Sequence, residues 1–249
     1  MALNTLALVQ AGERTSVTGK AVTNKILLGI SDSEYRSIRP HLEYLGLPRH
    51  YTLHEPNEKT QFVYFLNEGL LSLVVVTLSG RTVEAGIVGK EGIVGLGSAV
   101  GLTKNPLRHI VQIAGSGFRI SVGVLRTVLK SAPELQMMVS RYAVLHGLQV
   151  SQTAACNRLH DTEQRLARWL LMTQDRIGSG LLQITHDFLA TMLGTDRPTV
   201  TLAACRLQKK RLIEYSRGSV KILNRKKLEI SACECYGVVQ QFNGDLGLK

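Results

Sequence analysis

The sequence predicts an α+β fold in three parts: an antiparallel β-roll, a long central helix and a C-terminal winged helix-turn-helix. Three observations predict it. Short apolar runs between glycines fill residues 25–131, a heptad pattern covers 132–160, and two helix signals around a glycine precede a basic hairpin within 161–249. Residues 1–24 are expected to form a flexible N-terminal arm, as chain termini commonly do.

The composition predicts globular domains with buried cores, because the 249 residues are 44% hydrophobic and 20% charged. The formal net charge of +11 suggests an anionic partner, which could be nucleic acid, an acidic membrane surface or an acidic protein. No segment approaches the ~20 consecutive apolar residues of a membrane helix. Four cysteines do not make a disulfide framework at this length. We therefore expect a soluble, cytoplasmic protein without a membrane partner.

The predicted β-roll consists of short strands between frequent turns. Glycines recur throughout the region, and β-branched residues are common in the runs between them. A short helix is expected before the roll, starting near Ser31, because Glu34 lies at the spacing of a capping box. The clearest strand candidates are residues 61–66, 70–78, 82–88 and 109–113.

The central helix is expected to begin near Pro133, which suits the first turn of a helix. Seam residues then recur at alternating spacings of three and four, as in a coiled coil. Either this seam packs against the chain's own roll, or it forms a dimer interface. We favour dimerisation, because so long a helix has a second face to cover. The predicted dimer seam is Leu135, Met138, Tyr142, Leu145, Gln149, Gln152, Cys156 and Leu159.

A second helix is predicted over residues 162–176. After a break at 178–180, the last region is expected to hold the helix-turn-helix, a basic hairpin and a polar tail. The buried face of the second helix is expected to contain Leu166, Trp169, Leu170 and Thr173.

Several requirements of a helix-turn-helix are met in one stretch of the last region. Thr185 is a good N-cap for the first helix, and Gly194 falls where the chain must turn with a positive φ. Thr195 or Asp196 can cap the second helix, whose first turn tolerates Pro198. The buried faces would be formed by Leu189, Ala190, Leu193, Val200, Ala203 and Leu207.

The outer face of the second helix is a candidate for reading DNA, because the N-terminal part of such a helix meets base edges. Arg197 can donate two hydrogen bonds to guanine, whereas Thr201 and Leu202 can contact thymine methyl groups. The alternative is a helical hairpin of an ordinary small domain. The predicted DNA-contacting residues are Thr185, Arg197, Pro198, Thr199, Thr201, Leu202, Cys205, Arg206, Lys209, Arg217 and Ser219.

A hairpin is predicted after the second helix, with strands at 212–215 and 219–223, which makes the arrangement winged. Basic residues are dense here, and such a density suits phosphate contacts that weaken with salt. On the alternative interpretation they form a solvated surface. These residues are Arg206, Lys209, Lys210, Arg211, Arg217, Lys221, Arg225, Lys226 and Lys227.

The residues at 184–190, at Gly194, at 197–200 and at 207–215 resemble the Crp–Fnr superfamily of bacterial transcription regulators. The order of roll, long helix and winged domain matches that family from about residue 25 to 235. The resemblance implies a cyclic-nucleotide-binding-like jelly roll, a dimerisation helix and a DNA-binding domain. It also implies a homodimer on a partly palindromic operator.

The chain departs from the family at two kinds of position. Arg197 matches a base-contacting arginine, but Pro198 and Leu202 stand where glutamate and arginine are common, so the operator is expected to differ. In the roll, Leu96 replaces the glutamate that holds the ribose of cyclic AMP, and a site without that polar partner loses discrimination. Cyclic AMP is therefore doubtful as the effector. The candidate effector residues are Gly95, Leu96, Gly97, Arg108, His109, Gln149, Ser151 and Gln152.

No cofactor is identified from the sequence. The sequence has no N-terminal cysteine cluster that could hold an iron–sulfur centre. Haem is not excluded as a cofactor, because His109 could ligate its iron. Cys233 and Cys235 lack a second pair of metal ligands, so no metal site is predicted. Both cysteines are expected to be ordinary residues of a C-terminal helix. Cys156 is expected to be a core residue, and Cys205 is a hypothetical oxidation sensor on the DNA face.

The sequence favours a homodimeric, sequence-specific DNA-binding regulator whose roll binds an unknown effector. Its expected partners are double-stranded DNA and a second copy of itself, with RNA polymerase and a small molecule as further candidates. The alternative is a ligand-binding or protein-interaction module with an incidental basic C-terminal domain. A nucleophile elbow, a phosphate loop and a catalytic pair are all missing, so catalysis is not predicted.

Overall fold

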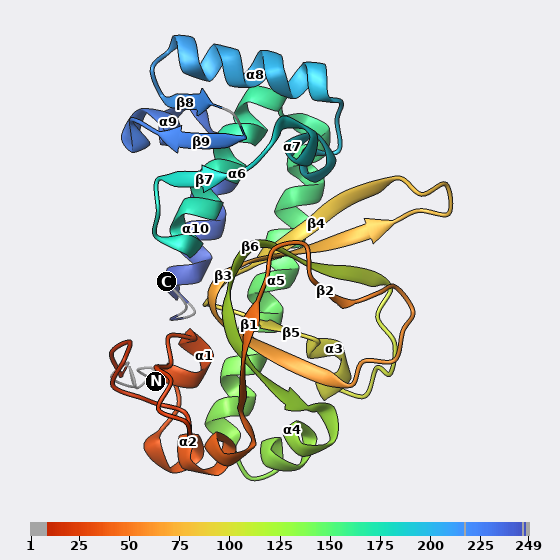
Figure 1. The fold of residues 1–249 in the computed structure, drawn as a ribbon, viewed down its shortest axis with the longest axis vertical. Helices are drawn as coiled ribbons and strands as arrows, with labels where there is room; N and C mark the ends of the chain where they lie inside the picture. Colours follow the sequence, from red (N-terminus) through yellow and green to blue (C-terminus); the bar gives the residue numbers. More distant parts are fainter. Residues whose placement is uncertain (1–8, 217, 246, 248–249) are drawn as a thin grey trace.

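The protein consists of a β-roll, a long helix beside it and a smaller helical domain above both (Figure 1). The structure is a computed structural model that describes residues 9–216, 218–245 and 247. The long helix, α5 (Pro133–Leu159), runs along the roll toward the upper domain, which begins with α6 (Thr162–Ile177). The α+β fold expected from the sequence is confirmed.

The roll is built on two long antiparallel strands, β3 (Phe62–Val76) and β6 (Leu107–Ser121), which pair along most of their length. The sheet order is β1-β6-β3-β4, with β2 on β6 and β5 on β3. Helix α4 (Val122–Leu129) leads from β6 toward α5. The remaining elements of the roll are β1 (Glu43–Leu47), β2 (Thr52–His54), β4 (Thr82–Val88), β5 (Ile93–Val94) and α3 (Leu96–Ala99).

The predicted strands at 61–66 and 70–78 are one strand rather than two. Gly69 was expected to form a turn between them. Its φ is +88° and it lies at an irregularity in the β3–β6 pairing, but the strand continues through it. A Cβ at Gly69 would lie 2.5 Å from the carbonyl oxygen of Ile113, so a larger residue would separate the strands. The predicted strand at 82–88 coincides with β4.

The expected flexible arm is wrong for residues 9–24, which fold against the roll. The Arg14 side chain is 5% exposed and donates to the carbonyl oxygens of Leu27 and Ile30 and to Asp32 at 2.6–2.7 Å. Buried carbonyls need such donors, so this arginine fastens the segment. Residues 1–8 lie outside the described part of the chain.

The helix predicted near Ser31 is confirmed as α2 (Asp32–Ile38), after the short α1 (Lys25–Leu28) and before a 3₁₀ turn at Arg39–His41. The predicted capping box is wrong, because Ser31 makes no side-chain cap. Glu34 instead accepts hydrogen bonds from the backbone N–H groups of Glu134 and Leu135, at 2.9 and 2.8 Å. It thus caps the start of α5, where unpaired N–H groups favour a carboxylate.

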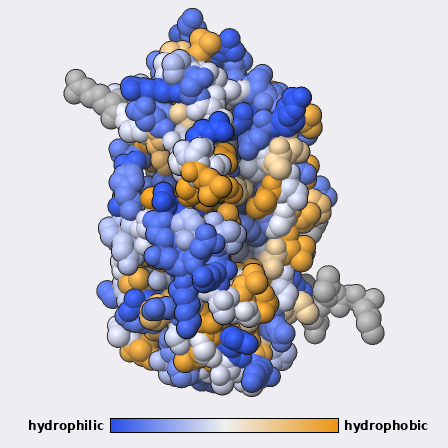
Figure 2. All heavy atoms as spheres, turned by 90° about the vertical axis from the view of Figure 1, so that its right-hand side faces the viewer, coloured by the Kyte–Doolittle hydropathy of each residue, from blue (hydrophilic) through white to orange (hydrophobic). Residues whose placement is uncertain are grey.

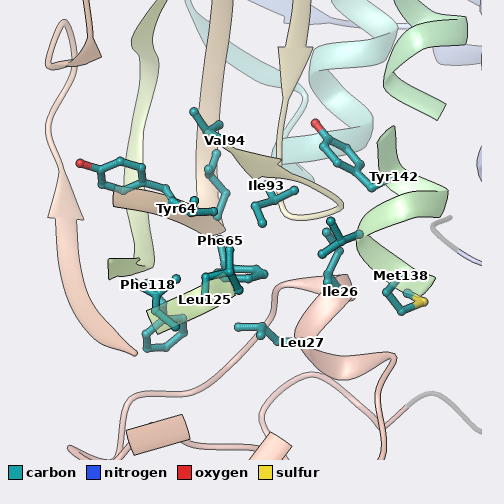
Figure 3. Close-up of a cluster of buried hydrophobic side chains, with 14 of the residues drawn as sticks. Ile26, Leu27, Tyr64, Phe65, Ile93, Val94, Phe118, Leu125, Met138 and Tyr142 are labelled. Atoms are coloured by element: carbon teal, nitrogen blue, oxygen red, sulfur yellow. The ribbon is translucent and has the colours of Figure 1, made fainter. Parts of the chain in front are cut away.

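The predicted dimer seam of α5 mostly faces the chain's own roll. In Figure 3, Met138 and Tyr142 lie on the same side of α5 as Ile26 and Ile93 of the roll core. Dimerisation through this seam is therefore wrong, because heptad spacing identifies a buried face without identifying what covers it. Gln152 is half-buried and Leu159 is 74% exposed, and the buried members are Leu135, Met138, Tyr142, Leu145, Gln149 and Cys156.

The upper domain packs three helices and a small sheet into a second core. Helix α6 has the predicted extent and buries Leu166, Trp169, Leu170 and Thr173 as expected. The expected polar tail is instead two further helices, because Leu228 and Val239 are buried in this core. The other elements are β7 (Leu181–Gln183), α7 (His186–Leu193), α8 (Arg197–Lys209), β8 (Ile213–Ser216), β9 (Ser219–Ile222), α9 (Arg225–Ser231) and α10 (Cys235–Asp245).

The upper domain is joined to the roll by apolar packing and buried polar contacts. Leu70, Val74 and Ile87 of the roll belong to the same core as α6 to α9. Arg176 of α6 donates to Glu91 at 2.8 Å and to Gln149 of α5 at 2.7 Å. One core and one polar cluster thus hold three parts of the chain together.

The surface also carries apolar residues, which form a band along one edge of the view in Figure 2. Exposed apolar side chains on α5 include Met137 and Val144, at 54% and 59% exposure. Among the helices of the described residues, none is both long enough and apolar enough to cross a membrane.

Candidate nucleic-acid interface

Side-chain caps begin both helices of the helix-turn-helix, as the sequence predicted. The Thr185 hydroxyl accepts from the backbone N–H of Phe188 at 3.2 Å at the start of α7. Asp196 accepts from the N–H of Thr199 at 2.7 Å at the start of α8, so of the two candidate caps it is Asp196 that acts. Pro198 occupies the first turn of α8, where its missing N–H costs nothing.

The turn between α7 and α8 depends on Gly194, whose φ is +60°. A Cβ there would also lie 2.9 Å from Cγ2 of Val83 on β4, so the turn sits close against the roll. The buried faces are confirmed, and they place the opposite side of α8 at the surface. The buried residues are Leu189, Ala190, Leu193, Val200, Ala203 and Leu207.

The exposed side of α8 gathers most of the predicted base-contacting residues. Leu202 is 54% exposed, and Arg197 is 65% exposed with a 3.3 Å ion pair to Asp187. Such an exposed pair is weak, so it holds the Arg197 guanidinium only loosely. The other exposed members are Thr185, Pro198, Cys205, Arg206 and Lys209, and Thr199 and Thr201 are half-buried.

Two residues that sequence reasoning missed connect α8 to the wing. The His186 ring stacks on Tyr215 of β8 with 3.8 Å between ring centroids, and His186 Nδ1 is 2.9 Å from the Thr201 hydroxyl. Burial lowers the pKa of His186, and the Arg197 guanidinium lowers it further. Thr201 also donates to the carbonyl oxygen of Arg197 at 2.9 Å, so its hydroxyl is engaged within the protein.

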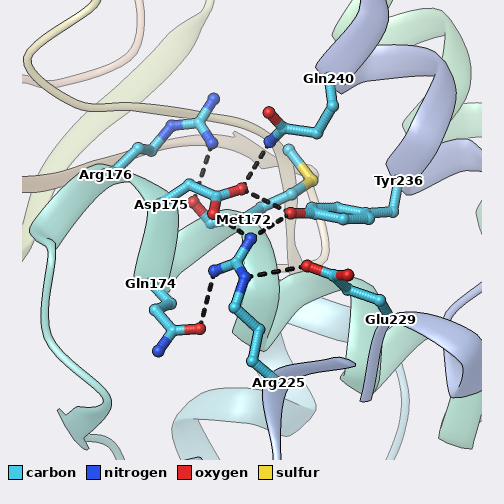
Figure 4. A network of polar contacts seen from close by, with 8 residues as sticks. All are labelled: Met172, Gln174, Asp175, Arg176, Arg225, Glu229, Tyr236 and Gln240. Atoms are coloured by element: carbon cyan, nitrogen blue, oxygen red, sulfur yellow. Dashed lines mark hydrogen bonds and ion pairs between the residues drawn. The ribbon is translucent and has the colours of Figure 1, made fainter. Parts of the chain in front are cut away.

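Some of the predicted phosphate contacts are engaged elsewhere. Arg225 bonds Gln174 and Asp175 of α6, together with Glu229 and Tyr236, at 2.6–2.9 Å (Figure 4). Arg225 thus fastens α9 and α10 to α6, and its guanidinium is engaged within the protein.

Lys210, whose side chain is 56% exposed, forms an ion pair at 2.5 Å with the Glu163 carboxylate, whose side chain is 14% exposed. Lys209, Arg211, Lys221 and Lys227 are exposed. At the wing tip, Ser219 donates to the carbonyl oxygen of Ser216 at 2.8 Å, and Arg217 lies outside the described residues. Of these exposed cations, Lys221 lies on β9 of the wing.

The candidate effector residues are spread over three places. Gly95–Gly97 lie at the start of α3, where Gly95 approaches the carbonyl oxygen of Phe62. Arg108 on β6 donates to Glu55 at 2.9 Å, and its neighbour His109 is 1% exposed. Burial lowers the pKa of His109 to about 3, so its ring is neutral near pH 7.

On α5, Ser151 is exposed and Gln152 is half-buried. The Gln149 amide donates to the carbonyl oxygen of Ile87 at 3.0 Å and accepts from Arg176. Both ends of the Gln149 amide are thus engaged in contacts that hold the domains together.

Comparison with known proteins identifies a family domain in this part of the chain. Residues 164–230 match the family model described as a Crp-like helix-turn-helix domain. A curated relative, the global nitrogen regulator of Nostoc sp., is 24% identical over 184 residues, which is 70% of this chain and 82% of that protein.

Two solved structures share the fold with TM-scores of 0.65. A Crp/Fnr-family transcriptional regulator from Eubacterium rectale is 18% identical, over 81% of this chain and 94% of that chain. The c-di-GMP-responsive global regulator CLP of Xanthomonas campestris is 16% identical, over 77% and 99% respectively. The chain thus carries a Crp-like helix-turn-helix domain, on a fold that it shares with solved transcription regulators of the Crp/Fnr family.

Proposed function

We propose that the protein binds a partly palindromic DNA operator as a homodimer, with one α8 in the major groove of each half-site. The observation that carries this proposal is the exposed N-terminal part of α8, held by the buried residues Val200, Ala203 and Leu207. In this motif that part of the helix reads base edges. Two identical subunits related by a two-fold axis would read half-sites about one helical turn apart.

Base reading is assigned to three exposed side chains of α8. Arg197 would exchange its weak ion pair with Asp187 for two hydrogen bonds to guanine, because a bidentate contact is much stronger. Leu202 and the exposed Pro198 offer only apolar contact, which suits thymine methyl groups. Lys209, Lys221 and the wing would contact phosphates.

The homodimer is proposed to form through the outward face of α5. Met137 and Val144 are exposed apolar residues one heptad apart, and Ser151 and Arg158 continue the row. Small residues at Gly147, Ser151, Ala154 and Ala155 would let a second α5 approach closely. This face is separate from the seam that packs against the roll.

We further propose that the effector is not cyclic AMP. Leu96 is partly buried against the roll core, and Arg108 is paired with Glu55, so neither is placed to receive a ribose or a phosphate. A cyclic AMP titration followed by thermal unfolding tests this, because a ligand of the native state raises the midpoint. A saturable rise at micromolar cyclic AMP would contradict it.

The proposed role is regulatory rather than catalytic, in the cytoplasm, where the protein would meet both DNA and RNA polymerase. Selection of genomic fragments on the purified protein, followed by mobility shifts at several salt concentrations, tests it. We expect a recurrent palindromic motif and an affinity that falls steeply with salt. Binding without sequence preference at moderate salt would favour an interaction module with an incidental basic domain.

A further inference from the structure

Three cysteines and one histidine from two distant parts of the sequence meet at the junction between α5 and the upper domain. Cys156 lies in the last turn of α5, and His160 is the C-cap residue that directly follows this helix. Cys233 lies between α9 and α10, and Cys235 begins α10. The three sulfur atoms and one ring nitrogen all lie within 4.8 Å of one another.

We propose that Cys156, His160, Cys233 and Cys235 bind one Zn²⁺ ion as a closed, tetrahedral Cys₃His site. Zn–S and Zn–N bonds of about 2.3 and 2.1 Å separate tetrahedral ligands by about 3.8 Å for two sulfurs and about 3.6 Å for sulfur and nitrogen. Here Cys156 and Cys233 sulfurs are 3.4 Å apart, and Cys235 sulfur is 3.7 Å from His160 Nδ1. The four donors are thus spaced for a single ion.

The surroundings of the cluster suit a bound cation better than an ordinary core. The cysteines are 1–3% exposed and form a group separate from the two apolar cores. The second ring nitrogen of His160 is 3.2 Å from Glu234, the carboxylate–histidine arrangement that commonly orients a zinc ligand.

Other uses of these residues fit the geometry less well. A disulfide needs sulfurs about 2.05 Å apart, and a Cys156–Cys233 bond would leave Cys235 and His160 without a purpose. An iron–sulfur cluster places several iron and sulfide atoms between its ligands, so it would need donors further apart than 4.8 Å. A packing role alone needs no imidazole nitrogen directed at a thiol.

The position of the site gives the ion a structural consequence. Helix α5 ends at Leu159 and α6 begins at Thr162, so His160 lies in the connection between them. Because α10 packs against both α5 and α6, the ion would fasten this connection to the last helix. Metal removal is therefore expected to loosen the upper domain relative to α5.

The test measures metal on the purified full chain. We expect one zinc per chain by elemental analysis, and the visible absorption of tetrahedral, thiolate-ligated Co²⁺ when the chelator-treated protein is titrated with Co²⁺. Cys235→Ser and His160→Ala should lose that spectrum, whereas His160→Cys should keep a tetrahedral one. Cys205→Ser is the matched control, because this cysteine is exposed on α8 and should leave metal content unchanged.

The Co²⁺ titration of the unaltered chain keeps the proposal testable even where a variant folds poorly, which circular dichroism would detect. A Co²⁺ spectrum of octahedral type would overturn the proposal. So would equal metal affinity of the unaltered chain and Cys235→Ser, a brown protein containing iron and sulfide, or a metal-free protein with a Cys156–Cys233 disulfide.

Discussion

Trp169 of α6 donates its indole N–H to the buried carboxylate of Glu84 on β4, at 2.8 Å. Glu84 is 6% exposed, and its other oxygen accepts from the Ser72 hydroxyl. Burial raises the pKa of the Glu84 carboxyl to about 7, although both hydrogen bonds oppose that rise. The contact between the roll and the upper domain thus includes a carboxyl group that gains a proton near neutral pH.

Glu84→Gln is expected to change how stability depends on pH. The pKa of Glu84 is 4.5 when unfolded and about 7 when folded, so the unfolded state ionises first as pH rises and native stability falls between these values. The loss should be on the order of 3 kcal/mol. Glutamine keeps an acceptor for Trp169 and a donor for Ser72 without ionising.

Urea unfolding of both proteins from pH 4.5 to 8 measures this difference. The two stabilities should be similar at the acidic end, and the variant should be the more stable one at pH 8. If the free energies of unfolding of the two proteins changed in parallel over the whole pH range, the pKa of Glu84 would be the same in the folded and unfolded states.

Arg176→Met is expected to destabilise the protein by about 3–5 kcal/mol, as removal of one partner from a buried ion pair does. The Arg176 and Glu91 side chains are 5% and 8% exposed, so the variant leaves the Glu91 carboxylate buried without its partner. Adding Glu91→Gln should recover part of the loss, because the uncompensated charge is removed.

Arg126→Met serves as the control for Arg176→Met, because Arg126 is exposed on α4. Its free energy of unfolding should change by less than about 0.5 kcal/mol. An equally small loss for Arg176→Met would mean that the ion pair between α6 and the roll contributes little.

Local chemistry explains why the helix-turn-helix could be predicted so closely. Thr185, Gly194 and Pro198 each impose a backbone requirement that depends only on neighbouring residues, and the structure meets all three. His186 and Tyr215 were missed because stacking between a helix start and a wing strand leaves no periodic signal in sequence. Sequence showed that Pro198 and Leu202 replace residues that are common at these positions. Only the structure shows that both side chains are exposed on α8, where they can contact DNA bases.

Contacts between distant segments account for most of what sequence could not provide. The α5 seam was recognised, but Met138 and Tyr142 meet the roll rather than a second helix. Cys233 and Cys235 lacked a visible second pair, because Cys156 lies 77 residues before Cys233. Periodicity and spacing report which side chains share a face, and tertiary structure decides what that face meets.

Val144→Glu is expected to convert the proposed homodimer to a monomer, because it places a charge in the middle of the outward α5 face. Light scattering coupled to size-exclusion chromatography measures the mass. Val17→Glu is the matched control, since Val17 has nearly the same exposure, 58% against 59%, but lies in the N-terminal segment. A dimer that survives Val144→Glu would place the interface elsewhere.

Arg197→Ala is expected to weaken discrimination at one or two base pairs by about 1–3 kcal/mol, as loss of a bidentate guanine contact should. Its side chain is 65% exposed and its ion pair with Asp187 lies at the surface, so folding should be little affected. Competition binding with single-base operator variants measures the change in preference.

Lys221→Ala is the comparison for Arg197→Ala, because Lys221 is an exposed wing residue assigned to phosphate. It should weaken binding about equally on every sequence and lower the slope of affinity against salt by about one unit. An equal loss on all operators for Arg197→Ala would instead make Arg197 a phosphate contact. In that case Leu202 and Pro198 would be left as the main base-contacting residues of α8, and the operator should then be recognised largely through thymine methyl groups and DNA shape.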